Sequence, residues 1–272
     1  MSAVTLASPR GPLARFRPGI PWKATRIAIF YAGLIALWQL FYELELWPHY
    51  VFPSPRDVWD TLRAKIEDGT IRDAAELTLK RMGAGYSISI VIGLVVGIAK
   101  GTMKWVDETL GSLVLGLQSL PSVTWLPLAL LWFGLNERAI IFVVLMGSVN
   151  SIAISARSGV RAIPPLQLRA ARMFGGNPLQ MYGYVIIPAM APAMVQGLKL
   201  GWSFAWRSLL AAELLFVSQS LGYLLQSGRD LQDVQLVMSV MIIIVAIGMA
   251  VDRLVFGTME RWVQERWGLA QA

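Results

Sequence analysis

Long apolar runs without charged residues alternate with short charged segments along this chain. A helix that crosses the hydrocarbon layer of a membrane needs about 20 mostly apolar residues. With charged residues allowed at the helix ends, the pattern predicts an all-α membrane protein. Its six transmembrane helices are expected near residues 24–44, 80–100, 109–133, 138–157, 189–216 and 235–256.

The second predicted helix has a regular series of glycines. Gly85, Gly93, Gly97 and Gly101 are separated by multiples of four residues. Small residues at this spacing let helix backbones approach closely in lipid, although glycine is also generally enriched in membrane helices. We favour a tightly packed helix at the centre of the bundle.

The third predicted helix contains Pro121 and Pro127 near its middle. Proline removes a backbone donor and breaks or kinks a helix. Irregular backbone at membrane depth persists only where protein or a water-filled cavity covers it. The two prolines therefore indicate either a helix that lines a solute path or a kink used only for packing.

The charge distribution predicts the topology. Hydrophobic residues make up 56% of the 272 residues and charged residues only 15%, against about 25% charged residues in soluble domains. With the N-terminus inside, the inner segments carry most of the basic residues and the outer segments are net negative, as the positive-inside rule requires. We predict cytoplasmic termini, with an N-terminal tail at 1–23, a transmembrane domain at 24–260 and a C-terminal tail at 261–272. The basic residues do not gather on one soluble face, so we expect contact with membrane lipid and none with nucleic acid.

Side chains for catalysis or metal binding are scarce. The chain has no cysteine and a single histidine, His49, without a carboxylate cluster beside it. These facts predict no metal site, no catalytic residue and no enzymatic activity.

Three ionisable residues, Lys199, Arg207 and Glu213, lie within the fifth predicted helix. Ionisable groups at membrane depth usually face a bundle interior, a partner or a cavity. The guanidinium of Arg207 suits recognition of an oxyanion, or it forms a structural pair with Glu213 or helix carbonyls. Lys199, nearer the inner end, is expected to extend its amine to the interface.

The inner loop at 157–188 predicts a short helix, a glycine corner and a second helix that returns to the membrane. Pro165 suits the first turn of a helix. Gly175 and Gly176 can end that helix, and Asn177 with Pro178 can begin the next one. Such a helical elbow either offers its exposed face to a cytoplasmic partner or lies on anionic lipid.

The loop resembles the EAA loop of binding-protein-dependent ABC importer permeases. That pattern is Glu-Ala-Ala, three residues, Gly, nine residues, Ile, any residue and Leu-Pro. Four positions fall in register, namely Ala170, Ala171, Gly175 and Pro188. Arg169 stands in place of the glutamate, Val185 in place of the isoleucine and Ile187 in place of the leucine. The stretches "FPSPRDVWDTL", "LPSVTWLPLALLWFG" and "AWRSLLAAELL" also resemble the nitrate, sulfonate, taurine and bicarbonate branch of these permeases, over residues 30–260.

The resemblance implies an ABC type I importer permease (MetI-like) fold in the cell inner membrane. It implies separate cytoplasmic ABC ATPase subunits, a second permease chain in a homodimer and an external solute-binding protein. The chain has no G-x-x-x-x-G-K-[ST] motif, so ATP is expected on the ATPase partner and no cofactor on this chain. The resemblance implies coupling to the ATPase through the 165–188 loop, with Leu168, Arg169, Ala170, Ala171, Arg172, Phe174, Gly175, Gly176 and Pro188. We expect Arg207, Glu213, Pro121 and Pro127 along the path of a small solute, such as nitrate, a sulfonate, taurine or bicarbonate.

Two other classes of protein compete with the importer permease. An ion-coupled secondary transporter, or a membrane scaffold, would have no ATPase partner. A membrane-embedded enzyme would need clustered His, Asp or Glu in its helices. The permease hypothesis accounts for both the elbow and the missing nucleotide motif.

Overall fold

A computed structural model of the chain describes residues 22–175 and 177–267, and every regular element in those ranges is a helix. The chain divides into two compact units, Met1–Pro55 and Arg56–Ala272. The N-terminal tail expected at 1–23 lies outside the described residues except for its last two, which begin the first helix. Gly176 of the predicted glycine corner also lies outside them.

The first unit contains one long helix, α1, Trp22–Glu43. Its apolar segment Thr25–Glu43 is long enough to cross a membrane, as predicted. The indole nitrogen Nε1 of Trp38 donates a hydrogen bond to the carbonyl oxygen of Pro53 at 3.1 Å. Phe52 packs against the rings of Trp38 and Trp47, so aromatic contacts fold the following loop back onto the end of α1.

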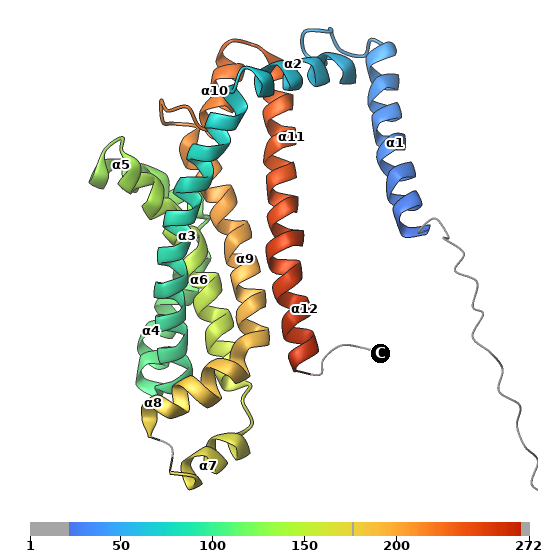
Figure 1. Ribbon diagram of the computed structural model, residues 1–272. Helices are drawn as coiled ribbons and strands as arrows, with labels where there is room; N and C mark the ends of the chain where they lie inside the picture. The colour runs from blue at the N-terminus through green and yellow to red at the C-terminus, as the bar shows by residue number, and fades with distance from the viewer. Residues whose placement is uncertain (1–21, 176, 268–272) are drawn as a thin grey trace, which may run out of the picture. The chain divides into compact units, whose positions relative to one another are not determined.

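The second unit is a bundle of helices (Figure 1). Its elements are α2 (Pro55–Glu67), α3 (Thr70–Thr102), α4 (Lys104–Gln118), the 3₁₀ turn η1 (Ser122–Trp125), α5 (Leu126–Phe133), α6 (Glu137–Arg161), α7 (Pro165–Met173), α8 (Pro178–Met181), the π-helical turn η2 (Tyr182–Ile186), α9 (Ile187–Glu213), α10 (Leu221–Asp230), α11 (Val234–Val251), the π-helical turn η3 (Asp252–Phe256) and α12 (Gly257–Arg266). Helix α12 continues into the range expected to be a C-terminal tail.

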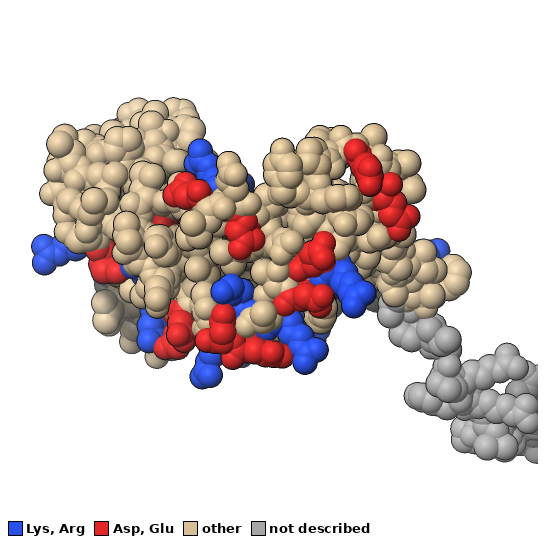
Figure 2. Space-filling model, turned by 90° about the horizontal axis from the view of Figure 1, so that it is seen from above, with Lys and Arg blue, Asp and Glu red and all other residues tan. Residues whose placement is uncertain are grey.

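Among the described residues of the whole chain, five helical segments are long and apolar enough to span a membrane, or six if the bent pair α4 and η1–α5 counts as one span. This agrees with the six predicted positions. Helix α3 begins ten residues before the predicted start, because it continues beyond the apolar run into a polar segment. Figure 2 looks onto the end of the second unit that carries α2 and α10, where acidic and basic side chains lie close together. Exposed pairs there include Arg63 with Glu67 and Lys80 with Glu76.

Helices α3, α6 and α9 lie side by side at the centre of this unit (Figure 1). The predicted glycine series of α3 faces α6 throughout. A Cβ atom added at Gly85 would lie 2.8 Å from Val144 Cγ1, and one at Gly97 would lie 2.5 Å from the carbonyl oxygen of Ala153. The prediction of a tightly packed central helix is therefore confirmed, since no side chain fits at these contacts without a shift.

The third predicted span is broken, with a bend of 98° between α4 and the pair η1–α5. Pro121 lies in the break, directly before η1. Pro127 has a different place, because it is the second residue of α5, where a missing backbone N–H leaves no hydrogen bond unmade. The break thus falls at Pro121 alone, and Pro127 starts the following helix rather than kinking a continuous one.

Candidate functional site: a cavity and a helical elbow

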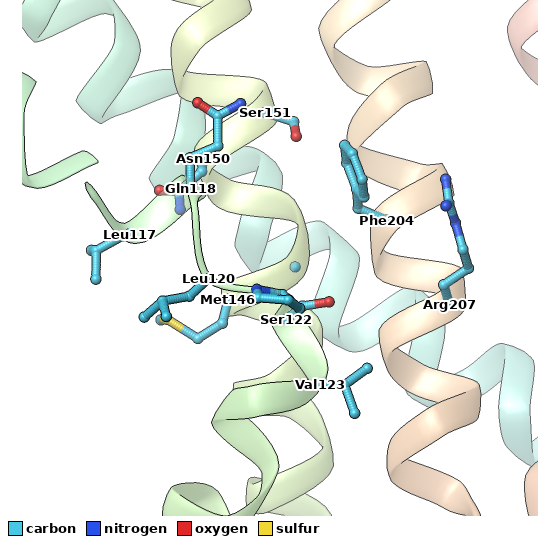
Figure 3. Close-up of a pocket in the computed structure, with 12 residues that line it drawn as sticks. Leu117, Gln118, Leu120, Ser122, Val123, Met146, Asn150, Ser151, Phe204 and Arg207 are labelled. Carbon is cyan, nitrogen blue, oxygen red and sulfur yellow. The ribbon is translucent and has the colours of Figure 1, made fainter. Parts of the chain in front are cut away.

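A cavity of about 340 Å³ lies beside the break in the third span (Figure 3). Its polar wall consists of Gln118, Ser122, Asn150, Ser151 and Arg207, from α4, η1, α6 and α9. The rest of the lining is apolar and consists of Leu117, Leu120, Pro121, Val123, Met146, Gly147 and Phe204. A mostly apolar cavity with a few convergent polar groups is typical of a small-molecule site.

The backbone break and the helix packing together create this wall. Ser208 Oγ of α9 donates a hydrogen bond to Ser122 Oγ of η1 at 2.6 Å, which holds the broken span against α9. Gly147 of α6 faces the same serine, so α6 and α9 approach closely beside the cavity. The polar residues of α4 and α6 are thereby brought opposite α9.

Arg207 is exposed and lines both this cavity and a neighbouring one formed by α9, α11 and η3. Its Nε donates to the carbonyl oxygen of Ser203 at 3.1 Å, and the guanidinium carbon lies 5.2 Å from the centre of the Phe204 ring. It forms no ion pair with any carboxylate of the described residues. The guanidinium therefore keeps N–H donors that can bind an oxyanion.

Glu213 occupies a different place from Arg207. It is completely buried at the end of α9. Its Oε2 accepts hydrogen bonds from Thr78 Oγ1 at 2.9 Å and from the backbone N–H of Gly222 at 3.2 Å. Its Oε1 accepts one from Arg81 Nη1 at 3.1 Å. Glu213 therefore pairs with Arg81 and not with Arg207, and neither it nor Pro127 lines the cavity.

Arg81, which the sequence analysis did not single out, joins four parts of the second unit. It is 6% exposed, and its Nη2 and Nε donate to the two carboxylate oxygens of Glu137 at 2.5 and 2.8 Å. Its Nη1 also donates to Ser218 Oγ at 3.0 Å. We call Thr78, Arg81, Glu137, Glu213 and Ser218 the Arg81 network. It connects α3, α6, α9 and the segment before α10.

Two further groups of ion pairs lie away from the Arg81 network. Asp107 of α4 accepts hydrogen bonds from Arg157 and Arg161 of α6. The amine of Lys199 lies 3.2 Å from Asp252 Oδ1 and 3.4 Å from Glu260 Oε1. The amine of Lys199, which is expected to extend to the membrane interface, lies between two carboxylates of the η3–α12 segment.

The loop at 157–188 forms the predicted elbow. Helix α7 starts with Pro165 at its first position, and Gly175 follows it with a φ of +77°, a conformation that glycine adopts without strain. Asn177 then caps α8, because its side chain accepts from the backbone N–H of Gln180 at 2.8 Å while Gln180 Oε1 accepts from the N–H of Asn177 at 3.0 Å. Pro188 is the second residue of α9.

The elbow has a buried side and an exposed apolar side. Leu168 packs against a small core of Ala156, Val160, Ile163, Ile186 and Met190. Leu166, Met173, Phe174 and Leu179 point away from that core, and Phe174 is 92% exposed. Of the other predicted coupling residues, Arg169 and Arg172 are exposed, and Ala170 and Ala171 are partly buried. An exposed apolar group of this kind marks a surface that contacts another protein or a membrane.

The described residues contain no group of three or more His, Asp or Glu side chains that could hold a metal ion. His49 lies against the ring of Tyr42 and 3.5 Å from Glu45. The geometry offers a cavity in a membrane bundle and an exposed elbow.

Comparison with known proteins assigns these features to a family. Residues 89–267 match the model of the family described as binding-protein-dependent transport system inner membrane component. The chain belongs to this family. It is therefore the membrane-spanning translocation subunit of an ABC importer and is not an enzyme. Membership also means that an ATPase and a solute-binding protein are its partners, and that it lies in the inner membrane.

Individual relatives agree with this assignment. An ABC transporter permease protein of Methanocaldococcus jannaschii is 33% identical over 186 residues, which cover 68% of this chain and 70% of the relative. The taurine transport system permease protein of Escherichia coli is 28% identical, covering 73% of this chain and 74% of the relative. The bicarbonate transport system permease protein of Synechocystis is 25% identical, covering 81% and 82%.

The fold has a counterpart among solved structures. An amino acid ABC transporter chain matches with a TM-score of 0.57 and 23% identity, over 75% of this chain and 97% of that chain. This similarity confirms the predicted type I permease (MetI-like) fold.

Proposed function

We propose that this importer subunit carries a small oxyanion, such as a sulfonate, taurine, nitrate or bicarbonate, through the cavity beside Pro121. The observation that carries the proposal is Arg207, a cation without a carboxylate partner among the described residues, in the wall of a cavity lined by candidate membrane-spanning helices. Hydroxyl and amide groups of Ser122, Asn150 and Ser151 supply further hydrogen bonds for the oxygens of an anion. Relatives named for taurine and bicarbonate transport carry solutes of this class.

The proposal includes the route by which ATP hydrolysis drives transport. The exposed side of the elbow, formed by Leu166, Met173, Phe174 and Leu179, docks on the cytoplasmic ATPase. Its buried side, through Leu168 and Ile186, transmits the movement to α6 and α9. This route requires the elbow and both chain termini to lie in the cytoplasm, and attachment of a membrane-impermeant reagent to the elbow from outside would contradict it.

We also propose that two copies of this chain form the complete path as a homodimer. One copy supplies six spans when the bent pair is counted as one, and family members transport solutes as membrane components of a larger assembly. A purified complex with a single copy of this chain would contradict the homodimer.

Uptake into proteoliposomes tests the solute path. The permease is reconstituted with its ATPase and binding protein, and uptake of taurine, an aliphatic sulfonate, nitrate and bicarbonate is measured. Arg207→Gln should lower uptake of the transported anion about ten-fold, because a hydrogen bond to a charged group contributes about 1.5–3 kcal/mol. Co-purification of the ATPase should stay unchanged.

Arg138→Gln is the matched control, since Arg138 is an exposed arginine at the start of α6 and does not line the cavity. Equal uptake by both variants would contradict the anion path. Parallel losses of uptake and of ATPase co-purification in Arg207→Gln would make Arg207 a structural residue.

A further inference from the structure

A second cavity, of about 540 Å³, lies where the elbow joins the membrane helices. The ends of α3 and α6 form one side of it, and α7 with η2 forms the other. Val160, Ile163, Leu168 and Ile186 give it an extended apolar wall. This cavity is separate from the exposed tip of the elbow, where Met173, Phe174 and Leu179 lie.

The polar part of this cavity is cationic. Arg161 and Arg172 line it together with the hydroxyls of Thr102 and Tyr182, and no acidic side chain of the described residues does so. Arg172 forms no ion pair within the described part of the chain. Arg161 donates one Nη2 hydrogen bond to Asp107, at 2.5 Å, and its side chain is still 47% exposed.

The surroundings add positive charge that is not neutralised. Asp107 is shared between Arg157 and Arg161. The nearly buried Lys100 lies within electrostatic range of Asp107 and of both arginines. One carboxylate thus faces Lys100 and two arginines, and Arg172 adds a further charge at the cavity. An anion that enters the cavity is attracted by this excess.

We infer that this cavity binds the headgroup of an anionic phospholipid, with its phosphate between Arg161 and Arg172. A phosphate oxyanion matches the planar donors of the two guanidinium groups. The apolar wall beside them accommodates the glycerol and upper acyl chain of the same lipid molecule. Free inorganic phosphate would leave this apolar part of the cavity empty. Basic cavities between helices at the membrane surface are suited to such headgroups.

The bound headgroup has a mechanical effect on the elbow. Arg161 belongs to the end of α6 and Arg172 to α7, so one phosphate between them ties the elbow to the bundle. Loss of the lipid leaves two cations facing each other across the cavity, which favours their separation. Anionic lipid therefore stabilises the arrangement of the elbow seen in the structure, whatever solute the importer carries.

The test measures lipid retained by the purified permease–ATPase complex. Native mass spectrometry follows phosphatidylglycerol, with phosphatidylcholine as the uncharged comparison lipid. We expect selective retention of phosphatidylglycerol and about five-fold weaker retention in Arg172→Gln, because one basic residue near an anionic membrane surface contributes about 1 kcal/mol. Lys104→Gln is the control, since it removes an exposed positive charge near the same helix ends but outside the cavity.

Three outcomes would overturn the inference. Equal retention in Arg172→Gln and Lys104→Gln would show that lipid binds elsewhere or by diffuse attraction. Displacement of phosphatidylglycerol by millimolar inorganic phosphate alone would show that the apolar wall contributes nothing. A cross-link from a cysteine at position 172 to an acidic segment of the ATPase, with no lipid retained, would assign the cavity to the ATPase instead.

Discussion

The Arg81 network predicts a large loss of stability when its buried carboxylate is removed. In Glu213→Ala, Arg81 keeps its hydrogen bond to Ser218, and its remaining carboxylate partner is Glu137, whose side chain is 58% exposed. Thr78 and the backbone N–H of Gly222 lose their acceptor at the same time. Removal of one partner from a buried ion pair costs about 3–5 kcal/mol. Because Arg81 still contacts Glu137, we expect a loss in the free energy of unfolding near the lower end of this range, at about 3 kcal/mol.

The control for this prediction is Lys80, which precedes Arg81 on α3. Lys80 pairs with Glu76 at 2.6 Å, with side chains that are 71% and 57% exposed. An exposed pair of this kind contributes about 0–1 kcal/mol, so Lys80→Ala should change stability little. Both variants remove one ionisable group that belongs to an ion pair. A difference in stability between them therefore reports the burial of the Arg81–Glu213 pair and not the loss of a charge as such.

Unfolding of the purified protein in mixed micelles of increasing dodecyl sulfate content measures the difference, with tryptophan fluorescence as the signal. The double variant Arg81→Met, Glu213→Leu should recover much of the loss, since apolar residues of similar volume can replace a buried ion pair. Equal unfolding midpoints for Glu213→Ala and Lys80→Ala would refute the structural role of the network. Reduced transport with unchanged stability would instead support the placement of Glu213 along the solute path that the sequence predicts.

Two further predictions concern glycines. Gly97→Leu should lower the yield of folded protein, since a Cβ there lies 2.5 Å from the Ala153 carbonyl oxygen and overpacking costs about 1–3 kcal/mol. The yield is measured by size-exclusion chromatography, with Gly83→Leu as the control because Gly83 has open space beside it. Equal yields of the two variants would contradict the packing argument. Gly175→Val should reduce uptake per ATP hydrolysed without reducing membrane insertion, because a β-branched residue is strained at a φ of +77°. Gly175→Asn should retain more uptake, and full uptake by Gly175→Val would contradict the role of the elbow.

Much of this architecture is encoded in local sequence patterns. The apolar runs predict the spans, and the elbow follows from Pro165, Gly175 and Asn177, whose effects on the backbone are local. The glycine series of α3 predicts close packing, although it does not say that α6 is the neighbour. The resemblance to the EAA loop then identifies the family through the same residues.

The side-chain pairings could not be predicted in the same way, because they depend on contacts between distant segments. Arg81 lies at the edge of the predicted second span, near residues 80–100, but α3 begins at Thr70 and buries Arg81 about three turns later. The sequence does contain one indication that Glu213 has such a partner. A carboxylate inside a span needs a basic side chain at similar depth on another helix. The sequence also could not show that the break falls at Pro121 and not at Pro127, because this depends on which residue starts α5.

The close contact of α3, α6 and α9 limits how this subunit can change shape. No atom can be added at Gly85, Gly93 or Gly97 without a collision, and packed interiors with so little free space do not deform gradually. We therefore expect α3 and α6 to move together as a rigid body. Bending is expected at the π-helical turns Tyr182–Ile186 and Asp252–Phe256, where the regular helical hydrogen bonding is interrupted.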